Sequence, residues 1–174
     1  RAAAYDFESG GLYYNILDAD AKTVEVTNIN GTEREKVEGY NGELVIPASV
    51  ANGGVVYQVK QIGKYAFYNS DIESLVIENG VESIQNASFY WCFSLKQVSF
   101  PSSLRSIGSI AFWNCSSLQN IVLPEGFTTL SDQVFGYCYN VKSIELPSTL
   151  TSIGFSAFVG MESVTKIISR ITEP

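Results

Sequence analysis

Histidine is absent from this 174-residue sequence, and its absence removes several classes of chemistry at once. Histidine is the usual general base near neutral pH and the most common metal ligand, so hydrolases of the Ser-His or Cys-His type and histidine-ligated zinc sites are not expected. The carboxylates of Glu73, Glu78, Glu82 and Glu125 are scattered along the chain. Because no acid–base pair, nucleophile set or metal cluster can be assembled, we expect no enzymatic activity and no cofactor.

Positive charge is also scarce, with 11 Lys and Arg against 18 Asp and Glu and a formal net charge of -7. Nucleic-acid-binding proteins concentrate Lys and Arg on one face, so a DNA or RNA partner is not expected. The sequence contains no apolar run of about 18 to 20 residues, so we expect no membrane insertion of this segment. The glycine-rich segments 9–11 and 52–55 lack the Gly-Lys-Ser/Thr of a phosphate loop, which excludes a nucleotide site of that kind.

The sequence repeats itself with a period of about 23 residues, which is within the range of solenoid repeats. Phenylalanine marks each repeat, at Phe67, Phe89, Phe112, Phe135 and Phe158, and only the first interval is one position shorter than the others. Five positions before each phenylalanine stands an aliphatic residue, giving the column Ile62, Ile84, Ile107, Leu130 and Ile153. Since 45% of the residues are hydrophobic and the period is fixed, one folded domain built of stacked repeats is indicated.

Each repeat contains a short alternating segment that predicts one β-strand with one buried face. The buried positions recur as Leu75 and Ile77, Val98 and Phe100, Ile121 and Leu123, and Ile144 and Leu146. A proline follows the last apolar residue in three repeats, at Pro101, Pro124 and Pro147. Proline lacks the N–H that a strand would need, so the strand is expected to end there.

The segments 64–69, 109–114 and 155–160 precede the strands and are too short for a stable α-helix. We predict a single helical or 3₁₀ turn for each. One repeat cannot bury both edges of its apolar layer, so neighbours must stack, with parallel strands and crossovers of one hand. The predicted fold is a β-rich leucine-rich-repeat right-handed solenoid with one short parallel strand per repeat of about 23 residues.

The residues before the repeats follow a different pattern. Leu12 to Leu17 and Thr23 to Asn28 are rich in β-formers and are separated by the turn segment 18–22, which predicts a β-hairpin. We expect the hairpin to cover the open N-terminal edge of the stack. The predicted parts are an N-terminal β-hairpin cap over residues 1–43, the solenoid over residues 44–170 and a C-terminal tail over residues 171–174.

The repeats, read from Ser106-Ile107-Gly108 through Ala111-Phe112-Trp113 to Leu123-Pro124, resemble the BspA-type leucine-rich repeat. The N-terminal residues Tyr5-Asp6-Phe7 and Leu12-Tyr13-Tyr14 also resemble the leader of such proteins from Bacteroides-like bacteria. The resemblance implies a secreted or surface-attached protein, often proposed to adhere to host or matrix proteins, and it supplies no catalytic residues. The expected location is extracellular or at the cell surface, with the signal peptide missing from the sequence given.

Three cysteines, Cys92, Cys115 and Cys138, are each separated by one repeat length and therefore occupy one column. A line of thiols does not supply the tetrahedral ligand set of a zinc site, and the sequence has no histidine to complete one. A disulfide remains an alternative, because exported proteins often contain them. We expect reduced, buried thiols that pack as small apolar groups, and no metal.

The alternation also places a second set of side chains on the solvent side of the strands. These form two columns across the repeats, Ser74, Gln97, Asn120, Ser143 and Lys166 beside Val76, Ser99, Val122, Glu145 and Ile168. Small polar residues are ordinary on a solvated sheet face, but solenoids also use such extended surfaces to bind partners. The candidate protein-binding residues are Ser74, Gln97, Ser99, Asn120, Val122, Ser143, Glu145 and Lys166.

Aromatic residues follow the phenylalanine in most repeats, at Tyr68, Tyr90, Trp91, Trp113, Tyr137 and Tyr139. Exposed rings in a row can stack on sugars or anchor a protein interface, whereas rings at equal positions can also simply pack on one another. Tyr90, Trp91, Trp113 and Tyr137 are the candidate residues of such a ridge.

The leading functional hypothesis is a non-enzymatic adhesion module that binds a host or matrix protein through the strand face. The alternatives are a glycan-binding module that uses the aromatic ridge and a structural spacer in a larger surface protein.

Overall fold

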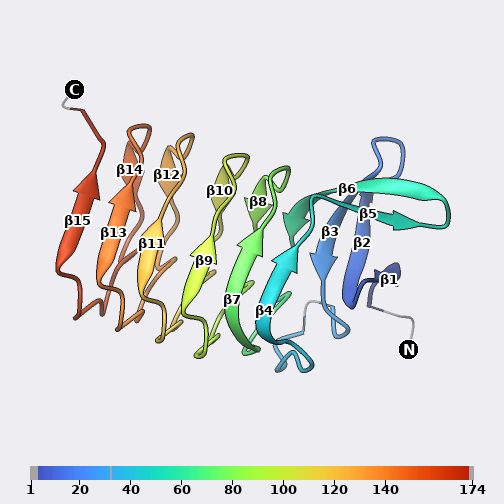
Figure 1. Cartoon of the computed structure of the whole chain (residues 1–174), viewed down its shortest axis with the longest axis horizontal. Helices are drawn as coiled ribbons and strands as arrows, with labels where there is room; N and C mark the ends of the chain where they lie inside the picture. Colours follow the sequence, from blue (N-terminus) through green and yellow to red (C-terminus); the bar gives the residue numbers. More distant parts are fainter. Residues whose placement is uncertain (1–3, 32, 173–174) are drawn as a thin grey trace.

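The computed structural model describes residues 4–31 and 33–172, which form strands β1 to β15 and contain no helix. The strands belong to successive coils that stack along the long axis of the molecule, with β1 and β15 at opposite ends of the stack (Figure 1). Residues 173 and 174 of the predicted C-terminal tail lie outside the described residues. The strand-rich stack agrees with the fold class expected from the repeats.

One wall of the stack, which we call the strand wall, contains the predicted strand of every repeat. Its members are β4 (Asn41–Ile46), β7 (Asp71–Ile77), β9 (Gln97–Ser99), β11 (Asn120–Val122), β13 (Ser143–Leu146) and β15 (Lys166–Ser169). The strands run parallel, as β4-β7-β9 and β11-β13-β15. Between these two groups the N–H of Gln119 donates to the carbonyl of Lys96 at 3.0 Å, so the wall is continuous.

The prediction of a single strand per repeat is wrong, because the aliphatic column forms a second wall. Its strands are β3 (Thr23–Thr27), β6 (Val55–Ile62), β8 (Ser83–Ile84), β10 (Ser106–Ile107), β12 (Thr129–Leu130) and β14 (Ser152–Ile153). They pair in parallel as β3-β6-β8-β10 and β12-β14. Strands β8, β10, β12 and β14 are too short to show the alternation by which a strand is recognised in sequence.

The third wall consists of turns rather than the predicted helical or 3₁₀ turns. Each coil has two residues in the left-handed conformation, four positions apart, such as Tyr65 (φ 58°) and Asn69 (φ 54°). The equivalent pairs in the later coils are Ala87 and Trp91, Ile110 and Asn114, Gln133 and Tyr137, and Ser156 and Gly160. Alternate amides donate to the next coil, for example Phe67 N–H to Ser88 O at 2.8 Å, while the amides between them, such as that of Tyr68, donate within their own coil. A helix would direct its amides along its own axis, whereas this alternation extends hydrogen bonding from coil to coil.

The N-terminal strands extend the second wall. Strand β1 (Phe7–Ser9) pairs antiparallel with β2 (Leu12–Asp18), and β2 pairs antiparallel with β3. The turn between β2 and β3 is closed by Asp18 Oδ1, which accepts the N–H of Ala21 at 2.8 Å. Strand β3 then pairs in parallel with β6, and β5 (Ser49–Asn52) pairs antiparallel with β6.

The interior is organised around the phenylalanine column. Successive rings lie 5.2, 5.1, 5.4 and 6.1 Å apart between centroids, with planes 2° to 18° from parallel, in the order Phe67, Phe89, Phe112, Phe135 and Phe158. The first four are fully buried. Burial of each such ring stabilises the fold by about 1.5 to 3 kcal/mol, so the stack is a principal link between coils.

Candidate functional site

The strand wall brings the predicted outward columns side by side. Ser74 is in register with Gln97, and Ser143 lies in register between Asn120 and Lys166. In the second column the pairs are Val76 with Ser99, and Val122 with Glu145 and then Ile168. Strand β4 adds Glu43 and Val45 at the N-terminal end of these columns.

A further outward column, which the sequence reasoning missed, lies immediately before the strand residues. It consists of Glu73, Lys96, Gln119 and Lys142, which occupy the same position in successive repeats. The repeat spacing that identified the other columns would also have identified this one. The ammonium of Lys96 lies 2.6 Å from a carboxylate oxygen of Glu73. The strand face therefore carries charge as well as the small polar groups predicted for it.

Charge is unevenly distributed along this face. The N-terminal strands contribute the carboxylates of Glu43 and Glu73, while exposed Lys142 and Lys166 stand toward the C-terminal end. Arg170 pairs there with the carboxylate of Glu145, and its guanidinium is 4.0 Å from Glu125.

Three shallow hollows lie over the strand wall. The first is lined by Gly42, Glu43, Glu73, Ser74, Lys96, Gln97 and Gln119. The second is lined by Lys96, Ser117, Gln119, Asn140 and Lys142. The third is lined by Ser74, Leu75, Val76, Gln97, Val98 and Ser99. The first two contain amide and ammonium groups, and the first also contains two carboxylates, so these hollows can exchange hydrogen bonds with a docked polypeptide.

The aromatic residues form a row along the third wall, which we call the turn wall. The first half of this row, Tyr68 and Tyr90, is buried. The ring of Tyr68 stacks on that of Tyr90 at 5.5 Å, and Tyr90 stacks on the indole of Trp113 at 6.5 Å. Tyr68 and Tyr90 are only 6% and 9% exposed. This part of the row is therefore a second small hydrophobic core on the outside of the turns. Tyr90 is buried in it, whereas the predicted ridge needed an exposed ring at this position.

The second half of the row is more open. Trp91, Trp113 and Tyr137 are half-buried, and the edge of Trp113 meets the ring of Tyr137 at 4.7 Å between centroids. Tyr139 is exposed and lies 5.8 Å from Tyr137. Exposed Phe93, which the sequence reasoning did not select, stacks on Trp91 at 6.3 Å. These rings provide an apolar surface next to the turn backbone.

The cysteine column is buried and contains free thiols. Each sulfur contacts a phenylalanine carbonyl of the preceding coil, and the Sγ to O distances are 3.1, 3.2 and 3.3 Å for Cys92, Cys115 and Cys138. Burial raises the pKa of Cys92 and of Cys138 to about 12, and it raises the pKa of Cys115 well above its usual range. The thiols therefore stay protonated and are poor nucleophiles.

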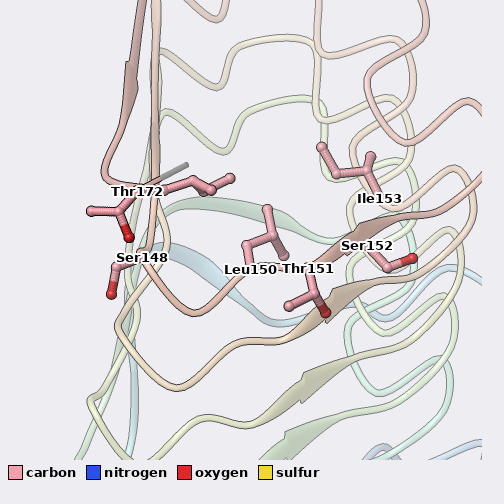
Figure 2. A pocket seen from close by; sticks show the side chains of 7 residues that line it. Ser148, Leu150, Thr151, Ser152, Ile153 and Thr172 are labelled. Atoms are coloured by element: carbon pink, nitrogen blue, oxygen red, sulfur yellow. The ribbon is translucent and has the colours of Figure 1, made fainter. Parts of the chain in front are cut away.

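The open C-terminal end of the stack forms a groove (Figure 2). It is lined by Ser148, Leu150, Thr151, Ser152, Ile153, Ile171 and Thr172. Ile153 is 49% exposed there, whereas its equivalents Leu130 and Ile107 are buried by the next coil. The lining contains hydroxyl and aliphatic groups, so the groove is an uncovered end of the core and lacks acid–base groups for catalysis.

Within residues 4–31 and 33–172 no three His, Cys, Asp or Glu side chains gather closely enough to hold a metal ion. The same part of the chain contains no helix long and apolar enough to span a membrane.

The family follows from the repeats themselves. The BspA type leucine rich repeat region matches residues 60–172 in six copies. The chain belongs to the BspA-type leucine-rich repeat family. The resemblance inferred from the repeat residues is therefore confirmed, and the match begins within β6 and extends past β15.

Solved leucine-rich repeat structures share this fold. A leucine-rich repeat protein from Bacteroides ovatus is 28% identical with a TM-score of 0.82 over 94% of this chain, which spans 41% of that protein's chain. The Treponema pallidum leucine-rich repeat protein has a TM-score of 0.74 at 21% identity, over 94% of this chain and 85% of that one. A leucine-rich cell surface protein from Faecalibacterium prausnitzii has a TM-score of 0.58 at 28% identity, over 95% and 54% of the two chains. No curated protein matches the sequence significantly.

Proposed function

We propose that this BspA-type repeat domain is a non-enzymatic interaction module of a secreted or cell-surface protein, and that it binds a protein partner through the strand face. The observation that carries the proposal is the in-register array of exposed Gln97, Asn120 and Lys166 on parallel strands. Six parallel strands span roughly 24 Å at the usual strand spacing, which gives a partner an extended, rigid platform.

The rigidity of the face supports the proposal. Its backbone is held by the ladder, and its side chains already make cross-strand contacts, such as the hydrogen bond from Ser143 Oγ to Asn120 Oδ1 at 2.7 Å. A preorganised surface loses less conformational entropy when it binds than a flexible loop does. The cell-surface description of the Faecalibacterium relative supports an extracellular location for this chain.

We also propose the handedness of the coil and the arrangement of its N-terminal end. A right-handed coil is favoured, because parallel crossovers are right-handed in almost all proteins. The hairpin of β2 and β3 would cap the N-terminal edge of a solenoid over residues 44–170, since β2 pairs with the side of β3 that faces away from β6. In that arrangement β2 protects an edge of β3 that would otherwise be free to pair with another chain.

The test uses the whole domain and a panel of purified extracellular-matrix proteins immobilised for biolayer interferometry. The double variant Lys142→Glu with Lys166→Glu reverses two charges on the strand face. The matched control, Lys22→Glu with Lys64→Glu, makes the same change in charge at exposed positions away from that face. We expect the strand-face variant to weaken binding to the partner at least about tenfold, and the control to leave it nearly unchanged.

If both double variants bound the partner equally well, the interface would have to lie outside the strand face. A panel with no saturable binding at all would instead favour the structural spacer. Binding to a glycan array that is lost only when Trp91, Trp113 and Tyr137 are changed would favour the sugar-binding alternative.

A further inference from the structure

Residues 33–38 form a strap across the first half of the aromatic row. The strap belongs to the connection between β3 and β4 and has no regular secondary structure. The guanidinium of Arg34 lies 5.0 Å from the ring centroid of Tyr90 and 5.7 Å from that of Tyr68. A guanidinium near tyrosine rings is attracted by their negative π-clouds, so the strap places a cation on this half of the row.

The next residues of the strap also contact the turn wall. The ammonium of Lys36 lies 2.9 Å from a carboxylate oxygen of Asp71. The N–H of Val37 donates to the carbonyl of Tyr68 at 2.9 Å, and Val37 is only 2% exposed. The turn wall therefore receives one arginine, one lysine, one backbone N–H and one apolar side chain, all from residues 34–37.

These contacts hold the strap weakly. The side chains of Lys36 and Asp71 are 40% and 60% exposed, so water screens the attraction between their charges. Val37 packs with Tyr68 and Tyr90 in the small cluster, whose buried residues are separate from those of the phenylalanine core. The strap can therefore leave the wall while the main core stays closed, which is typical of a segment of low local stability.

A glycine with a left-handed backbone stands on each side of the strap. Gly31 has a φ of 69° and Gly39 a φ of 91°. A Cβ built on Gly39 would meet no atom within 4 Å, so it is the backbone conformation rather than packing that favours glycine there. Because glycine adopts many φ and ψ values at little cost, the two positions are suited to act as hinges.

The strap is an imperfect occupant of the surface that it covers. Its two cations are outnumbered by three exposed carboxylates, those of Glu33, Glu35 and Glu38. The protein itself has a formal net charge of -7, so these carboxylates reduce the attraction between the strap and the wall. A segment with the same arginine, lysine and valine but no glutamate would be attracted more strongly.

We propose that the surface beneath the strap, formed by Tyr68, Tyr90 and Asp71, is a docking site for a basic segment of a partner protein, and that the strap is a built-in competitor that closes it. The partner segment would carry an arginine, a lysine two positions later and then an apolar residue, as residues 34–37 do. The strap has to swing out about its flanking glycines before this segment can enter. The site lies outside the strand face, so its test is independent of the proposed function.

Tryptophan emission reports on this site, because Trp91 and Trp113 both pack against the cluster beneath the strap. They are the two tryptophans of the chain, so the natural domain needs no label. The probe is a capped hexapeptide, serine-arginine-serine-lysine-valine-serine, which copies residues 33–38 with serine in place of each glutamate. Its matched control carries citrulline for arginine and norleucine for lysine. We expect a saturable change in emission with the cationic peptide and none with the neutral one.

The variant Arg34→Gln with Lys36→Gln tests the competition. It removes the charged contacts of the strap, so more molecules are open. Because the apparent affinity is reduced to the fraction of open molecules, this variant should bind the peptide at least about fivefold more tightly than the parent. The matched control, Lys142→Gln with Lys166→Gln, removes the same charge at exposed positions on the strand face and should change the affinity less than about twofold.

Two further measurements locate the peptide. Asp71→Asn, made in the background of the strap variant, removes the partner of the peptide lysine and should weaken binding about threefold. In the parent, bound peptide separates the Val37 amide from the Tyr68 carbonyl that accepts its hydrogen bond. Hydrogen exchange at Val37 should then become at least about fivefold faster at saturating peptide.

Equal affinity of the parent and the strap variant would overturn the proposal, because the strap would then not compete with the peptide. Unchanged exchange at Val37 under saturating peptide would place the peptide elsewhere and overturn it too. An equal response to the neutral peptide would show apolar rather than cationic recognition. If neither the parent nor the strap variant gave a saturable response, the surface would be only an internal contact of the fold.

Discussion

The indole of Trp113 lies over Gly136 on the next coil. A Cβ built on Gly136 would be only 2.4 Å from Cε3 and Cζ3 of the indole. The ring of Tyr137 is related to Gly160 in the same way, at 2.6 Å from the corresponding Cβ position to Cδ1. An aromatic side chain on one coil thus occupies the space left by a glycine on the next, which gives the second half of the aromatic row a structural role in coil stacking.

Gly136→Ala should destabilise the protein by about 1 to 3 kcal/mol, because the added methyl group forces the indole of Trp113 out of its position. The free energy of unfolding from urea titration measures the effect. In a Trp113→Ala background the same substitution should have less than about a third of that effect, since the obstructing ring is gone. An equal loss of stability in both backgrounds would contradict the contact between ring and glycine.

The phenylalanine column predicts a dependence on position. Phe112→Ala removes a fully buried ring with stacked neighbours on both sides and should reduce the free energy of unfolding by about 3 to 5 kcal/mol. Phe158→Ala should have a smaller effect, about 1 to 2 kcal/mol, because that ring is only half-buried and has one stacked neighbour. Chemical denaturation of both variants checks the order. Equal losses would show that the column does not act as a stack.

The buried thiols predict a loss of stability at high pH. The pKa of Cys92 and of Cys138 is raised from 9.0 to about 12, so the folded state keeps protons that the unfolded chain releases above about pH 9. The contribution is complete below pH 9 and declines as the pH rises toward 12, by roughly 1 kcal/mol per pH unit for each thiol. Urea titrations between pH 8 and 11 measure this decline.

A variant with alanine at all three cysteines is the control for this pH dependence. Its stability should fall less steeply above pH 9, although some decline should remain because the pKa of Tyr14 and of Tyr40 is also raised to about 12. An identical slope in the parent and the thiol-free variant would show that the thiols titrate normally.

The open end of the stack should unfold first. Ile167 on β15 is 64% exposed, whereas Ile144 and Ile121, its equivalents on earlier coils, are 4% and 1% exposed. Strand β15 also pairs on one side only. Amide hydrogen exchange should therefore be faster along β15 than along β7, which is paired on both sides. Equal protection of the two strands would contradict a stability gradient along the stack.

Spacing in the sequence was enough to predict the columns. A residue that recurs once per repeat length occupies the same place in every coil, so the stacked phenylalanines, the cysteine column and the outward columns of the strand wall could be read directly. Features that depend on backbone conformation could not be predicted from spacing. Ala87 and Ile110 are left-handed residues with no glycine to indicate it, and the short strands of the second wall have too few residues for a pattern.

Contacts between the non-repeating segments and the repeats could not be predicted from the sequence either. The position of Arg34 over Tyr68 and Tyr90 depends on the path of the chain between β3 and β4, which carries no repeat. The burial of Tyr90 depends on the same segment. For this reason the aromatic residues were recognised as a group, while the division of the row into a covered and an uncovered half was not.

The most direct test of the strand-face account is a ¹⁵N NMR titration of the 19.1 kDa domain with a partner identified on the matrix panel. The side-chain amides of Gln97, Gln119, Asn120 and Asn140 report on the strand face, and those of Asn69 and Asn114 report on the turn wall. The account predicts that the first group shifts saturably with added partner while the second stays unchanged. Shifts confined to Asn69 and Asn114 would contradict it.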